Sequence, residues 1–249
     1  MRVLVACEES QRVCMAFRAR GFEAFSCDVV GQSGGHPEWH IKDDVLKHLN
    51  DGWDLMIAHP PCTYISYAGT RWWSDNGRCL KRLEALDFFR QVWEAPIEPI
   101  CVENPRGCAS PTIAKYTQEI NPYYFGDEAT KPTWLWLKNL PKLKHIKQTD
   151  MFDDATHVSR GEFVYHMTAS GKMKGDSKWY TDAFRLPPDE RAKVRSATFP
   201  GIANAMAQQW GDYLEAQKQM DIVGHGSSMA HTLDTMHGTM LVSQIGKRL

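Results

Sequence analysis

The chain has 249 residues, of which 43% are hydrophobic and 24% are charged, and its formal net charge is −1. This length and composition are typical of a globular protein with one large domain. A nearly neutral chain is poorly suited to coating DNA, although the basic stretches 78–82, 142–147 and 189–195 could either contact nucleic acid or be solvated faces.

The cellular location is indicated by three features of the sequence. No run of eighteen or more apolar residues occurs, so we expect no membrane span. The apolar stretch at the N-terminus is short and is followed by acidic residues, so we expect no signal peptide. The seven cysteines form no CxxC pair, which predicts a reduced, cytoplasmic protein without a structural zinc site.

The first thirty residues predict a strand, a helix and a second strand. The apolar run RVLVA (2–6) is typical of a strand buried in a parallel sheet. Ser10 is placed to cap a helix over 11–21, and Gly21 is placed to end it. Residues 22–28 (FEAFSCD) complete a βαβ unit.

The same alternation continues to about Pro105. A short helix is expected over 44–50, a third strand over 53–59, a long helix over 78–95 and a fourth strand over 99–105. The long helix has apolar residues spaced to form one face: Leu80, Leu83, Leu86, Phe89 and Val92. Alternating strands and helices predict an α/β fold with an open, mostly parallel sheet and helices on both faces.

The pattern changes after Pro105. Residues 120–144 are rich in aromatic residues, Pro and Thr, which favours loops with one or two antiparallel strands. Residues 157–182 are polar and Gly-rich without a clear period, and are expected to be a mobile loop over a site or an insertion. Two later helices are expected over 187–194 and 200–219.

The chain is therefore expected to have four parts. These are a catalytic α/β core (1–104), a small substrate-facing insertion (105–182), helices that return to the core (183–218) and a disordered tail (219–249). Three histidines of the tail could bind a metal but more simply fit a solvated segment: His225, His231 and His237.

Polar or reactive residues follow each predicted strand. The first strand ends in CEES, the second in Asp28, the third in HPPC and the fourth in ENP. In open α/β sheets, ligands bind beyond the carboxyl ends of the strands. We therefore expect these four segments to meet at one edge and to form the site.

Cys62 is the candidate nucleophile. Pro60 and Pro61 fix the backbone that leads to it, and a nucleophile gains much of its rate from being held at the attack distance. The alternative is a buried structural cysteine. That alternative is preferred for the cysteines within apolar strands and helices: Cys7, Cys14, Cys27 and Cys101.

Glu103 ends an apolar strand, where an unpaired carboxylate would be costly. Burial would raise its pKa and let it donate or share a proton. A structural carboxylate that accepts from backbone N–H groups is the alternative. A cysteine and a carboxyl group on neighbouring strand ends would suit addition of a thiolate to an electron-poor ring that is protonated at the same time.

The motifs HPPCTY and VENP, in this order, resemble those of the cytosine-C5 DNA methyltransferases. The segments LVACEES, RARGFEAFSCD, WDLMIAHPPCTY, KPTWLWLKNLP and RSATFPGIANAMAQQWG are similar to a compact phage-type group of that family, over roughly residues 1–214. The resemblance implies a Rossmann-like methyltransferase fold that uses S-adenosylmethionine. It also implies that the chain acts on DNA, with the cytosine flipped out of the stack. We further expect a monomer and no membrane partner.

The resemblance also implies roles for individual residues. Cys62 would add to C6 of cytosine, Glu103 would act at N3, and Asn104 and Pro61 would complete the catalytic loop. The donor would be bound by Ala6, Glu8, Ser10, Asp28, Asp44, Pro60 and Asn204, with Gly201 beside Asn204 in the last motif. The substrate would be bound by Thr63, Tyr64, Arg71, Arg106 and Lys131.

Two departures from the family pattern keep alternatives open. The glycines of the usual first motif are replaced by ACEESQ, so that two carboxylates would face the donor pocket. No arginine-rich motif follows the Glu-Asn strand, and Lys131 or Arg106 is expected to replace it. Amino methylation of a base, C5 chemistry on a nucleotide or RNA or with a modified donor, and an inactive nucleic-acid-binding or decoy protein remain as alternatives.

Overall fold

Seven strands form one sheet in the order β3-β2-β1-β4-β5-β7-β6. The computed structural model describes residues 1–75, 77–145 and 159–220. Met1–Gln209 form one compact unit, which contains the sheet, and the described residues 210–220 belong to a second unit. The strands are β1 (Arg2–Ala6), β2 (Glu23–Cys27), β3 (His40–Ile41), β4 (Leu55–Ala58), β5 (Ile100–Pro105), β6 (Gln118–Ile120) and β7 (Thr133–Lys138).

The first five strands of this order run parallel. β7 is antiparallel to β5, and β6 is antiparallel to β7. The sheet is therefore mostly parallel, and its order is compatible with a Rossmann-like fold in which the direction of winding changes between β1 and β4. The prediction of an open α/β sheet is confirmed, and so is that of antiparallel strands within 120–144.

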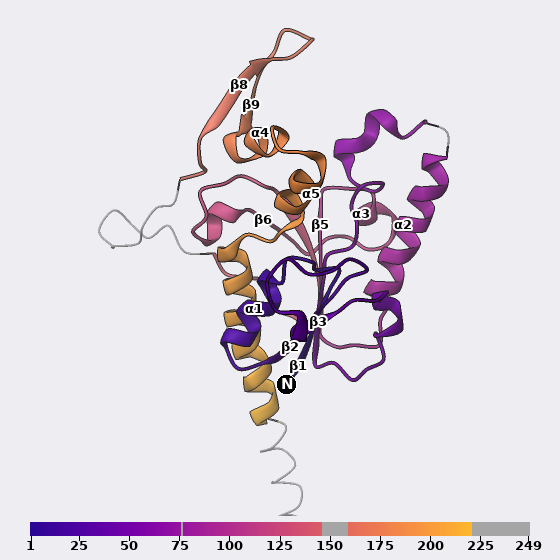
Figure 1. Ribbon diagram of the computed structural model, residues 1–249, viewed down its shortest axis with the longest axis vertical. Coiled ribbons are helices and arrows are strands. Elements are labelled where there is room, and N and C mark those ends of the chain that lie inside the picture. Colours follow the sequence, from indigo (N-terminus) through magenta and orange to yellow (C-terminus); the bar gives the residue numbers. More distant parts are fainter. Residues whose placement is uncertain (76, 146–158, 221–249) are drawn as a thin grey trace, which may run out of the picture. The chain divides into compact units, whose positions relative to one another are not determined.

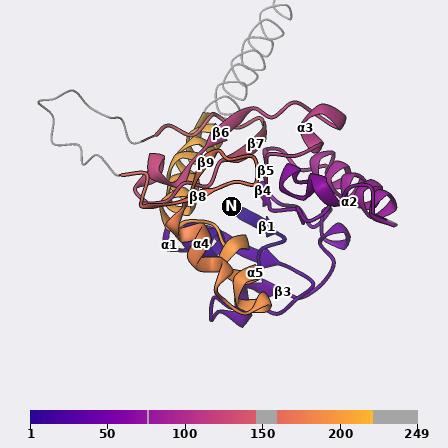
Figure 2. The same cartoon turned by 90° about the horizontal axis from the view of Figure 1, so that it is seen from above.

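Helices lie on both faces of the sheet, with α1 (Arg12–Ala19) on one face and α2 (Arg78–Trp93) on the other (Figures 1 and 2). The remaining helices of this unit are α3 (Ala109–Thr112), α4 (Lys178–Phe184), α5 (Pro188–Ser196) and residues 200–209. Short 3-10 helices are η1 (Pro37–Trp39), η2 (Val45–Lys47), η3 (Tyr67–Trp72) and η4 (Pro122–Phe125). In the second unit, residues 210–220 are helical.

The central strands are buried on both faces, which explains why they read as continuous apolar runs. Every residue of β4 is buried, as are the last four of β1. Phe89 of α2 packs edge-on against Trp136 of β7, with 5.0 Å between ring centroids, in one core cluster with Met56 and Ile100. The sheet is thus a rigid support for the loops at its carboxyl edge.

Two predictions about local structure are wrong, and a segment for which no element was predicted contains a hairpin. The N-terminal half of α2 does not bury its apolar residues, because Leu80 and Leu83 are 66% and 59% exposed. The hairpin is formed by β8 (Phe163–Met167) and β9 (Met173–Ser177), within the segment expected to be a mobile loop or an insertion. The helix expected over 44–50 is only the single 3-10 turn η2.

Two further expectations concern the ends of helices and the tail. Gly21 ends α1 as predicted, with a left-handed φ of 84° and its N–H donating to Arg18. The tail and its three histidines lie outside the described residues, apart from 219 and 220, which are helical. Among the helices of the described residues, none has the length and apolar character needed to cross a membrane.

Candidate active site

The ends of β1, β4 and β5 lie side by side, as the sequence predicts. Ala6 pairs with Ala58, Ala58 pairs with Val102, and the N–H of His59 donates to the Ala6 carbonyl at 2.9 Å. This register brings Glu8, His59 and Glu103 together at the carboxyl edge. His59 Nδ1 lies 3.1 Å from Glu103 Oε2, and both side chains are largely buried.

The loop that carries Cys62 is fixed to β5 before the cysteine. Asn104 is 2% exposed and donates from Nδ2 to the Pro60 carbonyl at 2.7 Å. Asn104 therefore holds the loop at Pro60. Because Pro60 and Pro61 have no backbone N–H, a bond to the Pro60 carbonyl is one of the few ways to fix this segment.

The same loop is fixed again after the cysteine. The Cys62 carbonyl accepts from the N–H groups of Ile65 and Ser66, which closes a tight turn. Ser66 forms a β-bridge with Gly107, and the Cys108 N–H donates to the Ile65 carbonyl at 2.9 Å. A Cβ at Gly107 would lie 2.4 Å from the Ile65 carbonyl oxygen, so only glycine fits.

Cys62 is exposed, whereas Cys14, Cys27 and Cys101 are buried, so the expected contrast between nucleophile and structural cysteines agrees with their positions. The surrounding side chains nevertheless restrict water around the thiol, which raises its pKa, and the Glu103 charge raises it further. Lys131 and Arg195 oppose this increase. Cys62 is therefore within electrostatic reach of one carboxylate and two cations.

The prediction that Glu103 has a raised pKa is wrong. Burial by itself would raise it, but the hydrogen bond and charge of His59 outweigh burial, with smaller contributions from Lys131 and Thr133. The net effect lowers the pKa, so Glu103 is a carboxylate at neutral pH. The sequence feature that accounts for this lowered pKa is His59, directly before Pro60, to which the motifs assign no role.

Glu8 and Ser10 do not have the positions predicted for them. The two carboxylate oxygens of Glu8 accept from the N–H groups of Val13 and Cys14, at 2.7 and 3.1 Å, so Glu8 rather than Ser10 satisfies the first turn of α1. Glu8 is 3% exposed, and burial raises its pKa. It therefore does not project into a donor pocket.

The turn between β1 and α1 has the backbone shape that glycine usually provides. Cys7 and Gln11 both have a φ of 57°, in the left-handed region that few other residues occupy. The absence of glycine from ACEESQ thus does not prevent a tight turn at this position.

Asp28 and Asp44 lie near each other at the ends of β2 and β3. Both carboxylates raise the pKa of Cys7, for which burial is the largest cause. Asp28 accepts from the Val30 N–H at 3.1 Å, and Asp44 accepts from the Leu46 N–H at 3.0 Å. Each carboxylate has a second oxygen, and the neighbouring Val29 is 68% exposed, so this corner could hold a ligand with hydroxyl or amino groups and an apolar ring.

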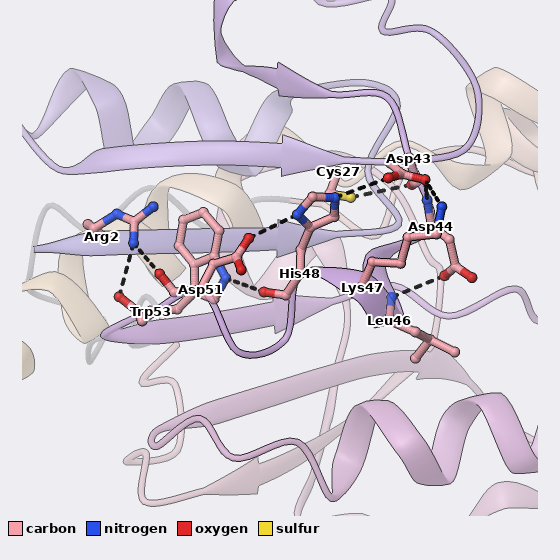
Figure 3. Close-up of polar contacts among 10 residues, drawn as sticks. Arg2, Cys27, Asp43, Asp44, Leu46, Lys47, His48, Asp51 and Trp53 are labelled. Carbon is pink, nitrogen blue, oxygen red and sulfur yellow. Dashed lines mark hydrogen bonds and ion pairs between the residues drawn. The ribbon is translucent and has the colours of Figure 1, made fainter.

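A network of polar contacts fixes the backbone next to Asp44 (Figure 3). Asp43 accepts from the Asp44 N–H and from Lys47 Nζ, both at 2.7 Å, and the Lys47 bond lowers the Asp43 pKa to about 2. His48 Nε2 lies 3.4 Å from Asp43, and its Nδ1 lies 2.9 Å from Asp51. The backbone around Asp44 is therefore fixed.

Two residues predicted to bind the donor are not brought to this corner by any described contact. Ala6 is fully buried within β1. Asn204 is exposed and lines a shallow groove with Arg12, Met15 and Pro200. Gly201 packs against η4, where a Cβ would lie 2.0 Å from the Phe125 carbonyl oxygen, so its absence of a side chain has a structural reason.

The residues predicted to bind the substrate differ in their surroundings. Thr63 is exposed, and the Tyr64 ring lies beneath Arg78 and Lys81, at 5.1 and 5.5 Å. Arg71 is in η3, within the same segment. Tyr64, Arg78 and Lys81 form a basic and aromatic surface beside the Cys62 loop.

Of the two candidates to replace the missing arginine motif, only Lys131 is near the site. Its charge acts on both Cys62 and Glu103, and its Nζ donates to the Arg195 carbonyl at 2.9 Å. Arg106 instead forms a two-bond ion pair with Glu119, at 2.7 and 2.9 Å. Arg195, near the end of α5, is a site cation that the sequence indicated only as part of a basic stretch.

Comparison with models of known protein families and with curated proteins gives no match. The site must therefore be interpreted from its own chemistry. It combines a rigidly held thiol, a carboxylate paired with an imidazole and two nearby cations.

Proposed function

We propose that the chain is a methyltransferase that transfers a methyl group from S-adenosylmethionine to C5 of cytosine in DNA. One observation supports it most: Cys62 and Glu103 follow neighbouring strands, the Glu103 charge acts on the Cys62 thiol, and the Cys62 loop is fixed to β5 before the cysteine and to the segment after β5 beyond it. This arrangement suits attack on one atom of a ring while another atom is held by a carboxyl group.

The residues would act in the following order. The Cys62 thiolate forms a bond to C6, which breaks the 5,6 double bond and makes C5 nucleophilic, while Glu103 acts at N3. Lys131 and Arg195, which favour the thiolate, would help it to form. After C5 has received the methyl group, loss of the C5 proton and of the Cys62 sulfur restores the double bond.

The donor would be held at the ends of β2 and β3. Asp28 is suited to ribose hydroxyls and Asp44 to an amino group, and the exposed Val29 provides apolar contact. S-adenosylmethionine would supply a methyl group activated by its positively charged sulfur.

The strand order gives further support. In doubly wound sheets, ligands bind where the winding changes direction, which here is between β1 and β4. The Cys7 turn follows β1, and the HPPC segment follows β4. A methyltransferase variant of the Rossmann-like fold would use this crevice for the donor and the base together.

Amino methylation of a base is a less suitable function for this site. Such chemistry needs an aromatic residue that stacks on the base and no thiol. Here the residue after the two prolines is Cys62, and the Tyr64 ring is already covered by two cations. DNA as substrate would require the cytosine to leave the stack, and the surface around Tyr64 is suited to the displaced strand.

The proposal is tested by incubating the chain with DNA and labelled S-adenosylmethionine, followed by digestion to nucleosides. We expect 5-methylcytosine from the wild type, none from Cys62→Ser, and wild-type levels from Cys79→Ser, because Cys79 is an exposed cysteine on α2. An N-methylated base would indicate amino methylation, and methylation by Cys62→Ser would exclude a covalent mechanism.

A second measurement separates an enzyme from a decoy. DNA that contains 5-fluorocytosine should trap a covalent complex through Cys62, because fluorine cannot leave C5 as a proton does. RNA and free nucleotide offered in parallel would identify a different substrate. Binding of DNA without trapping or methylation would support the inactive binding protein.

A further inference from the structure

Three ionisable side chains lie in a row across three adjacent strand ends. Glu8 follows β1, His59 follows β4 and Glu103 lies in β5, and these strands are neighbours in the sheet. His59 Nδ1 is 3.1 Å from Glu103 Oε2, and the His59 charge also acts on Glu8, where it opposes the larger effect of burial on the Glu8 pKa. His59 is thus placed between two carboxylates.

The burial of this pair distinguishes it from other histidine–carboxylate pairs. The side chains of His59 and Glu103 are 10% and 17% exposed, whereas those of His36 and Glu38, at the same distance of 3.1 Å, are 39% and 57% exposed. Moreover, His59 Nε2 is buried without a hydrogen-bond partner among the described residues. Among the described residues, the His59 ring is therefore held through Nδ1 and Glu103.

We propose that His59 is a positioning residue that acts through Glu103: as an imidazolium paired with Glu103, it stores the proton that cytosine N3 takes up when Cys62 adds to C6. This inference rests on the proposed function. It also resolves a difficulty of that function, since Glu103 is a carboxylate at neutral pH and has no proton of its own to give.

The proton and charge balance is as follows. Formation of the bond between Cys62 Sγ and C6 moves an electron pair of the ring towards N3. A proton passes from His59 Nδ1 to Glu103 and from Glu103 to N3, which leaves His59 neutral and the adduct uncharged at N3. When the Cys62 sulfur leaves, N3 returns the proton to the Glu103–His59 pair.

The charged groups around His59 set the expected pH dependence. The charged groups that face the pair are Glu8, on which the His59 charge acts, and Lys131, whose charge acts on Glu103. Cys62 must lose its proton for attack, whereas the His59–Glu103 pair must keep one. Two groups needed in opposite protonation states give a bell-shaped rate profile.

The test compares His59→Gln and His36→Gln with the wild type in single-turnover methylation of DNA over a range of pH. Gln at position 59 can still donate to Glu103 but cannot carry the proton. We expect the single-turnover rate constant to fall about 10²- to 10⁴-fold with little change in the affinity for DNA, and the bell-shaped pH profile to become a single rise with pH. His36→Gln should keep both the wild-type rate and its bell-shaped dependence on pH.

The outcomes separate this inference from the proposed function. If the wild type methylates DNA and His59→Gln keeps its rate and its bell, the role of His59 is wrong and the methyltransferase stands. If the wild type neither methylates nor is trapped by 5-fluorocytosine, both fail. His59→Asn serves as a second variant should His59→Gln not fold.

A further measurement does not depend on activity. In ¹H–¹⁵N spectra of the imidazole groups, the Nδ1–H of His59 should be protected from exchange with water and should lose this protection in Glu103→Ala. The exposed His36 pair provides the unprotected reference. A His59 Nδ1–H that exchanges as fast as that of His36 would overturn the proposed pair.

Discussion

Cys62 is subject to opposing electrostatic influences, and its reactivity should show them. Burial and Glu103 raise its pKa, whereas Lys131 and Arg195 lower it. A raised pKa means a smaller thiolate fraction at neutral pH, so the rate of alkylation by iodoacetamide should still be rising above pH 9. We expect Glu103→Gln to speed alkylation at pH 8, by about tenfold for each unit of pKa.

The opposite change provides the control for this prediction. Lys131→Met removes a positive charge and should slow alkylation of Cys62 at the same pH. Mass spectrometry of the labelled peptides reports each site separately, with the exposed Cys79 as an internal reference. Equal rates at Cys62 in all three proteins would contradict the electrostatic environment described above.

Strands could be predicted well from sequence, because a buried parallel strand needs a continuous apolar run and little else supplies one. The motifs after them could be placed at one edge for the same reason. The predictions that are wrong concern residues whose role depends on contacts with residues distant in the sequence. Glu8, rather than Ser10, accepts from an N–H group in the first turn of α1. The contact with His59 helps to lower the Glu103 pKa, which burial alone would raise.

Helix α2 illustrates a limit of periodicity. The spacing of Leu80 and Leu83 predicts burial, but the sheet supports only the C-terminal half of the helix, where Phe89 and Val92 are buried. An amphipathic pattern indicates which face could be buried but not how far along the helix a partner extends.

Gly107 links the Cys62 loop to the segment after β5, so its substitution should displace the whole Cys62 loop. A Cβ there would lie 2.4 Å from the Ile65 carbonyl oxygen, and backbone must move to accept it. We expect Gly107→Ala to lower the free energy of unfolding by about 1–3 kcal/mol. Methylation should fall further than this loss explains, because the thiol is displaced from its attack position.

Gly69→Ala is the matched control for Gly107→Ala. Gly69 lies in the same segment, but a Cβ there would be 3.6 Å from the Thr63 carbonyl oxygen, an ordinary contact. Urea unfolding of both variants checks the stability change. A Gly107→Ala protein as stable as Gly69→Ala would show that the two loops are not packed as described.

The nearly even balance of 29 basic and 30 acidic residues limits how the molecule as a whole can bind DNA. Binding must then come from local cations rather than from net charge. Arg78 and Lys81 lie over the Tyr64 ring beside the Cys62 loop, where they could contact phosphates.

This local origin predicts a specific salt dependence. Arg78→Ala and Lys81→Ala should each weaken DNA binding for all sequences and reduce the slope of log K against log salt concentration by about 1, because each removes one phosphate contact. Arg90→Ala, on the same helix, should leave the slope unchanged, since Arg90 is paired with Asp87 and Glu94 at 2.7 and 2.6 Å. Fluorescence anisotropy of labelled DNA at about 50 to 300 mM salt measures the slope of log K against log salt concentration. Equal slopes for all three variants would show that DNA does not bind at the surface around Tyr64.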